Sequence, residues 1–233
     1  MNRPIGISTL LAGMFVAGSA QALIIDNFST DQTVFVSAAA PATLSGNAVE
    51  SVIGGIISGD RDITVNKTTG PAGVVNAATA EATGGVLGVA NGPTTNSNVH
   101  VLWDGLNPAL TDLTAGGATG FYLSLPNPID NALKIDFNVN GPGGLSTITK
   151  SFANGASGAD FFFAFADFSV PTAFLAVSSI EMVLYSDSVA WDAQVDLVET
   201  RDRPPPPLPE PGTLGLIGLG LVGAMGLRRR KSA

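Results

Sequence analysis

The chain has 233 residues, a formal net charge of −8, one histidine and no cysteine. The lack of cysteine excludes disulfides, thiolate metal sites and cysteine nucleophiles. The acidic balance disfavours binding to nucleic acid and to anionic lipid surfaces, because both would repel it.

The first 22 residues are typical of a secretory signal peptide. Arg3 gives a positive start, residues 5–17 form an uncharged apolar run, and Ala20-Gln21-Ala22 is a small-x-small cleavage site. We expect export by the Sec route and cleavage after Ala22. A retained membrane helix is the alternative, but the run is shorter than the roughly 20 apolar residues that a bilayer requires.

Residues 23–209 lie between this leader and the C-terminal tail, and these 187 residues suffice for one domain with a sizeable core. They hold six basic residues against eighteen acidic ones, a net charge of −12. Such a charge favours solubility and attracts cations. We predict a single ectodomain over residues 23–200.

The ectodomain shows short apolar stretches of period two, separated by Gly, Asn, Pro, Ser and Thr clusters. The clearest strand is 133–139, where apolar residues alternate with Lys134, Asp136 and Asn138. Residues 140–144 then predict a long hairpin loop that leads into a strand at 145–150.

A second clear strand at 189–197 follows one at 180–185, and we expect these two to pair. About ten strands spaced near ten residues apart predict an all-β fold, a single β-sandwich of jelly-roll type. The remaining predicted strands are 24–28, 33–36, 49–57, 62–66, 86–89, 99–103, 121–125 and 161–165.

The stretch from Thr68 to Asn98 offers few large side chains to bury, because Ala, Gly, Thr and Asn dominate it. Two interpretations stay open for it, small-residue strands or a mobile excursion.

Residues 201–208 contain Pro204 to Pro207, which cannot join a β-ladder and favour polyproline II. This segment is predicted to be a semi-rigid linker that rises about 3.1 Å per residue.

The tail at 209–233 begins with Pro209-Glu210-Pro211 and continues with sixteen uncharged residues, 212–227. As a helix these sixteen would span about 24 Å, short of a hydrocarbon core of roughly 30 Å. A basic cluster follows, whose long side chains can reach the interface and keep the C-terminus cytoplasmic. The cluster is Arg228, Arg229, Arg230 and Lys231.

Six of these sixteen residues are glycine, which weakens a helix but allows close approach of another helix. The span is therefore expected to dock against a membrane partner, with self-dimerisation as the simpler alternative.

The PEP sequence, the Gly/Leu-rich span and the terminal arginines together resemble the C-terminal signal of PEP-CTERM proteins. The resemblance implies recognition by exosortase, a multi-pass membrane cysteine protease of Gram-negative bacteria that make extracellular polysaccharide. It also implies an inner-membrane intermediate whose tail is removed on sorting to the envelope or matrix.

Two other interpretations of the tail remain, a sortase signal and a permanent single-span anchor. Residues 208–212 match LPxTG at Leu, Pro and Gly, but Pro211 stands where the sortase motif has Thr.

Four ectodomain segments also resemble a subgroup of PEP-CTERM ectodomains that start with IDDFST. This resemblance supports the β fold and implies no activity. The segments are Ile25-Asp26-Asn27-Phe28-Ser29-Thr30, Gly59-Asp60-Arg61-Asp62-Ile63 (with Ser58-Gly59 in place of the subgroup's GG), Trp103-Asp104-Gly105, and Val195-Asp196-Leu197-Val198-Glu199.

Few residues suggest catalysis. His100 is the single histidine, and alternation places it opposite Val101 and Trp103, which favours a structural or solvated role over catalysis. A glycosidase would need a pair of carboxylates. Asp104, Asp160, Asp167 and Asp192 offer such pairs.

Oxygen ligands for Ca²⁺ are a further hypothesis. Asp60 and Asp62, or Asp26 with Asp31, could supply carboxylates, although neither set follows an EF-hand loop. Surface solvation is the simpler interpretation, and no other cofactor is expected.

A sugar-binding surface would need an exposed aromatic ring. Alternation favours the core for Trp103 and Trp191 and the surface for Tyr122, which makes Tyr122 the candidate glycan contact. The phenylalanines at 161–163 and 165 predict a strand buried on both faces.

The sequence thus predicts a non-enzymatic, exported envelope or matrix protein, structural or adhesive and linked to exopolysaccharide and biofilm. The alternative is a carbohydrate-binding module or a polysaccharide-acting enzyme on the same scaffold.

Overall fold

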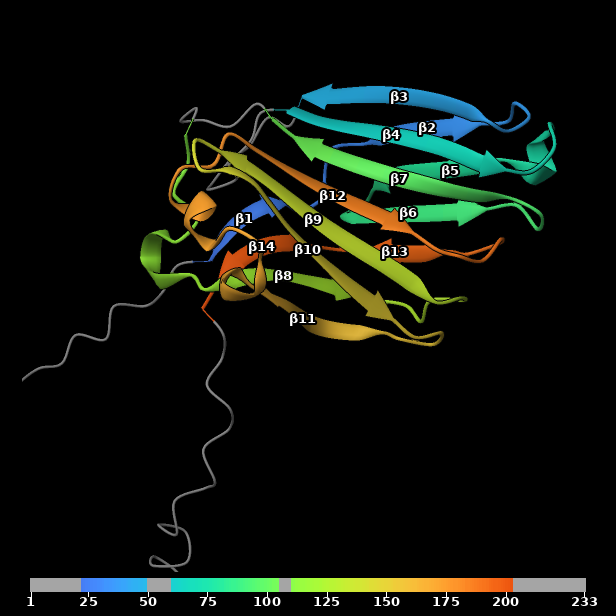
Figure 1. The fold of residues 1–233 in the computed structure, drawn as a ribbon. Helices are drawn as coiled ribbons and strands as arrows, with labels where there is room; N and C mark the ends of the chain where they lie inside the picture. The colour runs from blue at the N-terminus through green and yellow to red at the C-terminus, as the bar shows by residue number, and fades with distance from the viewer. Residues whose placement is uncertain (1–21, 50–59, 105–109, 203–233) are drawn as a thin grey trace, which may run out of the picture. The chain divides into compact units, whose positions relative to one another are not determined.

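The computed structural model of the chain describes residues 22–49, 60–104 and 110–202 (Figure 1). Their strands pair antiparallel and form three sheets, which confirms the predicted all-β class. The helices within these ranges are four 3-10 turns of three to five residues. They are η1 Val74–Asn76, η2 Ala115–Gly117, η3 Phe165–Asp167 and η4 Pro171–Leu175.

The largest sheet has six strands in the order β10-β9-β12-β7-β4-β3. Buried and more exposed residues alternate strictly along β7, so the sheet has an inner apolar face and an outer polar one. The strands are β3 Ala42–Val49, β4 Asp60–Thr69, β7 Asn96–Trp103, β9 Leu133–Gly141, β10 Gly144–Phe152 and β12 Ser179–Tyr185.

Two four-stranded sheets pack on the inner face of this sheet (Figure 1). We call the sheet of order β1-β14-β8-β11 the lower sheet and the sheet of order β13-β6-β5-β2 the upper sheet, after their places in the figure. The lower strands are β1 Leu23–Asp26, β8 Gly120–Leu125, β11 Gly158–Ala164 and β14 Val198–Arg201. The upper strands are β2 Gln32–Val36, β5 Ala78–Thr83, β6 Val86–Asn91 and β13 Ala193–Val195.

One hydrophobic core joins the three sheets. Phe121 of β8 stacks on Phe137 of β9 with ring centroids 4.8 Å apart. Phe163 of β11 meets Phe137 edge to face at 4.9 Å, so aromatic contacts connect the lower sheet to the six-stranded one.

The stretch from 68 to 98 contains small-residue strands, which was one of the two open interpretations. β5 and β6 form a hairpin around Gly84 and Gly85, whose φ angles of 59° and 88° favour glycine. The inward side chains of β5 are methyl groups, which let the upper sheet approach β4 and β7 closely. They belong to the fully buried Ala78, Ala80 and Ala82.

The predicted pairing of the 189–197 strand with the 180–185 strand is wrong. β12 pairs with β7 on one side and β9 on the other, so neither of its edges is free. The later strand shortens to β13, which pairs with β6 of the upper sheet. Alternation along a strand defines its faces but not its partner.

Smaller differences concern one hairpin turn and two strand predictions. The loop between β9 and β10 is short, because Gly141 pairs with Gly144 and leaves only Pro142 and Gly143 in the turn. β3 was not predicted, since its sequence is mostly small and polar. The predicted strand at 49–57 lies outside the described residues except for its first position.

A buried ion pair connects all three sheets. Arg61 of β4 and Asp26 of β1 are both fully buried, and Nη1 of Arg61 donates to both carboxylate oxygens of Asp26 at 3.0 Å. Nε of Arg61 donates to Oε1 of Gln32 on β2 at 2.8 Å. We call this arrangement, together with the Trp103 indole, the sheet tie.

Further hydrogen bonds complete the sheet tie. The indole Nε1 of Trp103, which pairs across from Arg61 on β7, donates to Oδ2 of Asp26 at 2.8 Å. The backbone N–H of Phe28 donates to Oδ1 of Asp26 at 2.7 Å, and Nη2 of Arg61 donates to the Thr30 carbonyl at 2.6 Å. Buried charges require such complete pairing, because an unpaired one would carry a large desolvation cost.

A second buried cation orders the loops beyond β4. Lys67 is 1% exposed, and its ammonium donates to the carbonyls of Ala38, Pro71 and Asn76 at 2.6–2.9 Å. All three ammonium protons are thereby used, which fixes the segment around η1 against β4.

The predicted signal peptide, the linker beyond Asp202 and the tail with its membrane span lie outside the described residues. Within the described ranges, no helix has the length and apolarity needed to cross a bilayer.

The sheet tie generates a stability prediction. Replacing Asp26 with Asn removes the carboxylate charge that Nη1 of the buried Arg61 contacts, so we expect a loss of about 3–5 kcal/mol and a fall in Tm of about 10 °C. Asp187→Asn is the matched control, because it removes the solvent-exposed Lys134–Asp187 pair and should leave Tm nearly unchanged. Equal, small shifts in calorimetry for both variants would contradict the role assigned to the tie.

Candidate functional site

Tyr122 is not the exposed ring that the sequence predicted. It faces away from the core on β8, but only 3% of its surface is exposed. The Arg201 guanidinium lies 3.7 Å from the ring centroid, and the Phe162 ring packs at 4.7 Å. Alternation gave the correct face of the strand, but Arg201 and Phe162 cover the ring, so Tyr122 does not present the open ring face that sugar stacking requires.

The other aromatic predictions mostly hold. Trp103 and Trp191 are at most 1% exposed and belong to the core. Phe163 and Phe165 are buried as expected, whereas Phe161 and Phe162 are only partly buried.

His100 lies on the outer face of the six-stranded sheet. Its Nδ1 is 2.8 Å from Oε1 of Glu181 on β12, and Oε2 of Glu181 accepts a hydrogen bond from Asn138 at 2.8 Å. This cross-strand contact fits the structural role that the sequence favoured.

The calcium hypotheses have different outcomes. The Asp26 carboxylate is buried in the sheet tie, so the Asp26 and Asp31 pair is wrong as a calcium site. Asp60 and Asp62 lie on β4. In the described part of the chain, no three His, Cys, Asp or Glu side chains come together as a metal site would require. Calcium at Asp60 and Asp62 stays a prediction.

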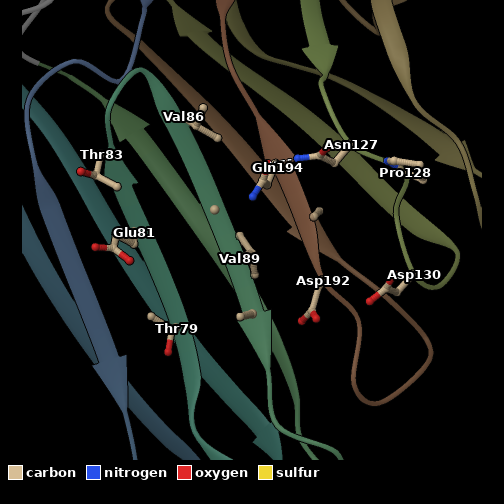
Figure 2. A pocket seen from close by; sticks show the side chains of 13 residues that line it. Thr79, Glu81, Thr83, Val86, Val89, Asn127, Pro128, Asp130, Asp192 and Gln194 are labelled. Atoms are coloured by element: carbon tan, nitrogen blue, oxygen red, sulfur yellow. Dashed lines mark hydrogen bonds between the residues drawn. The ribbon is translucent and has the colours of Figure 1, made fainter.

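Among the proposed catalytic carboxylates whose side chains the structure describes, Asp192 lines a cavity, whereas the side chain of Asp160 lies outside the described ones. This cavity, about 520 Å³ in volume, lies on the outer face of the upper sheet (Figure 2). We call it the upper groove. The structure does not bring Asp104 or Asp167 to it.

Four segments form the upper groove (Figure 2). Thr79, Glu81 and Thr83 point outward from β5 and make one wall. The floor is β6, and the other wall is Gln194 of β13 with Asp192 just before it. The loop between β8 and β9 adds Asn127, Pro128 and Asp130.

The strand register explains the hollow. Gly88 pairs with Glu81 on one side and with Gln194 on the other, so the central position of the floor has no side chain. The walls therefore rise on both sides of a floor that has no side chain at its centre.

Hydrogen bonds hold the second wall of the groove in place. The buried Ile129 exchanges backbone hydrogen bonds with the 155–156 turn, at 3.1 and 2.9 Å, and so fixes the loop that carries Asp130. Asn127 donates to Oε1 of Gln194. The N–H of Asn91 donates to Oδ1 of Asp192 at 2.9 Å.

The pKa of Asp192 is raised above its ordinary value. Partial burial disfavours its charged form, the hydrogen bond from Asn91 opposes that effect, and the negative charge of Asp130 adds to it. The described residues that line the groove include no lysine or arginine. The groove is therefore a region of uncompensated negative potential.

Sequence reasoning missed the groove, because its residues come from distant segments. One local signal was present. Gly88 interrupts an alternating strand pattern, and a glycine inside a strand often marks close approach of a ligand or another backbone.

The chain carries a PEP-CTERM protein-sorting motif at residues 207–231. This confirms the resemblance of the tail and supports a secreted protein that exosortase processes. No curated protein matches the chain. The motif gives no information about the upper groove, which lies in a different part of the chain.

The groove electrostatics can be tested directly. Asp130→Asn removes the neighbouring negative charge, so we expect the pKa of Asp192 to fall while burial still keeps it above the value of an exposed aspartate. Carboxyl ¹³C NMR titration of the wild type and the variant measures the change. Asp167→Asn, on an exposed turn, is the control. An unchanged Asp192 titration in Asp130→Asn would contradict the described coupling.

Proposed function

We propose that this chain is an exported envelope or extracellular-matrix protein, sorted by exosortase, whose β domain adheres to exopolysaccharide. The observation that carries the proposal is the sorting motif at residues 207–231. The function is structural or adhesive rather than enzymatic, and the final location is the surface or matrix of a Gram-negative bacterium.

The order of events follows from the chemistry of the two ends. Residues 1–22 direct Sec export and are removed after Ala22. Residues 212–227 then hold the chain in the inner membrane, with the basic cluster at the cytoplasmic interface. The glycines of the span let it dock against the helices of exosortase. Cleavage near Pro209-Glu210-Pro211 releases the domain.

The proposal includes the finer fold assignment. Three antiparallel sheets around one core suit a sandwich of jelly-roll type, an architecture that offers broad sheet faces to extended ligands. The acidic surface keeps such a domain soluble within a polysaccharide matrix.

A polysaccharide-acting enzyme is the second candidate, and Asp192 favours it. A half-buried carboxylic acid with a raised pKa beside a second carboxylate is the arrangement a glycosidase uses for its general acid. Release of reducing ends from the producing strain's exopolysaccharide, lost in Asp192→Asn, would favour this candidate over the adhesive one.

Sorting is tested by the intact mass of the protein from cells with and without exosortase. We expect a shorter chain, cut near residue 209, only when exosortase is present. Replacing Pro209, Glu210 and Pro211 with alanine should leave the tail attached and the protein in the inner-membrane fraction. Alanine substitution of the neighbouring Pro204 to Pro206 is the control, and it should be processed normally. A tail of the same mass in both strains would overturn the sorting proposal.

A further inference from the structure

We propose that the upper groove binds a segment of a cationic amino-sugar polymer, that is, a hexosamine polysaccharide with free amino groups. This rests on the proposed adhesion to exopolysaccharide and names the site and the chemical class of the ligand.

The fold does not require the glycine that leaves the centre of the groove floor without a side chain. A Cβ built on Gly88 would meet no heavy atom closer than 3.8 Å, which is ordinary contact, and its φ does not require glycine. A glycine inside a strand lowers stability relative to larger residues, yet here no backbone constraint accounts for it. The missing side chain instead gives a ligand direct access to the β6 backbone at Gly88.

The lining of the groove suits a sugar chain. Outward-facing Val86 and Ala90 flank Gly88 and give small apolar patches for the C–H faces of a pyranose. Thr79 and Thr83 place hydroxyl groups along one wall, and the amides of Asn127 and Gln194 lie on the other (Figure 2). Sites for polar ligands combine apolar contact with a few hydrogen-bonding groups in this way.

The negative charge of the groove favours a cationic sugar over an anionic one. Glu81 stands on one wall, and Asp130 and Asp192 stand on the other. No basic residue among the described ones lines the groove, so an anionic polysaccharide would be repelled and a cationic one attracted.

The spacing of the carboxylates argues for an extended ligand over a single ion. Within the described residues, no three acidic, histidine or cysteine side chains come together closely enough to hold one metal. Carboxylates distributed on opposite walls instead suit positive charges that repeat along a chain. A basic peptide would share this feature but not the need for pyranose faces and hydroxyl partners.

The binding test uses the full chain and a hexamer of β-1,4-linked glucosamine in isothermal titration calorimetry. The N-acetylglucosamine hexamer is the matched neutral probe, and hexalysine is the basic peptide probe. We expect the glucosamine hexamer to bind at least about tenfold more tightly than either of the others, with affinity falling as salt rises.

Three variants locate the site. Gly88→Val fills the floor with a residue that strands favour, and it should weaken binding by about tenfold or more without lowering Tm. Glu81→Gln keeps the shape and removes one charge, so it should weaken binding by several-fold, roughly the effect of one surface ion pair. Asp167→Asn removes a charge on an exposed turn away from the groove and should leave the affinity unchanged.

Equal affinity for the glucosamine hexamer in all variants would overturn the groove as the site. Equal affinity of the wild type for the neutral hexamer or for hexalysine would overturn the assigned ligand class. Retention on the producing strain's exopolysaccharide separates this inference from the proposed function. If wild type and Gly88→Val are both retained, the groove inference fails and adhesion stands. If the wild type is retained on no glycan, adhesion itself fails.

Discussion

The buried Arg61 and Asp26 side chains join strands of different sheets inside the core. Asp26 belongs to the lower sheet, Arg61 to the six-stranded sheet, and Gln32, which accepts a hydrogen bond from Nε of Arg61, to the upper sheet. Because a buried charge tolerates little displacement from its partners, this tie fixes how the two smaller sheets lie against the large one. The upper groove takes its floor, one wall and part of the other wall from the upper sheet, and the loop after β8 supplies the rest, so its shape depends on that placement.

Much of the fold could be predicted from the sequence, because alternation reports which face of a strand is buried. It placed Trp103, Trp191 and the β9 strand correctly. It could not give strand partners, which depend on contacts between distant segments, and so the pairing of β12 was wrong. Tyr122 failed for a related reason, since Arg201 and Phe162 reach it from neighbouring strands. The groove was invisible because no single segment contains it.

The segments that resemble the IDDFST subgroup acquire a physical meaning from the structure. Three of the four supply the charged and indole groups of the sheet tie, namely Asp26, Arg61 and Trp103. Their pattern is therefore a requirement of the core and not a signature of an active site. The groove residues do not belong to these segments. The sheet tie affects them only by fixing the position of the sheets that carry them. The sorting tail, the residues of the sheet tie and the proposed binding groove are thus formed by different residues of the chain.

The proposed contact between the domain and its matrix is the upper groove. Hydrogen exchange of the full chain, with and without exopolysaccharide from the producing strain, tests this without a chosen probe. We expect slower exchange confined to amides of β6, β13 and the 127–130 loop, where the ligand would cover the backbone near Gly88. Slowed exchange on the outer face of β4, β7 and β12, with no change around Gly88, would contradict it.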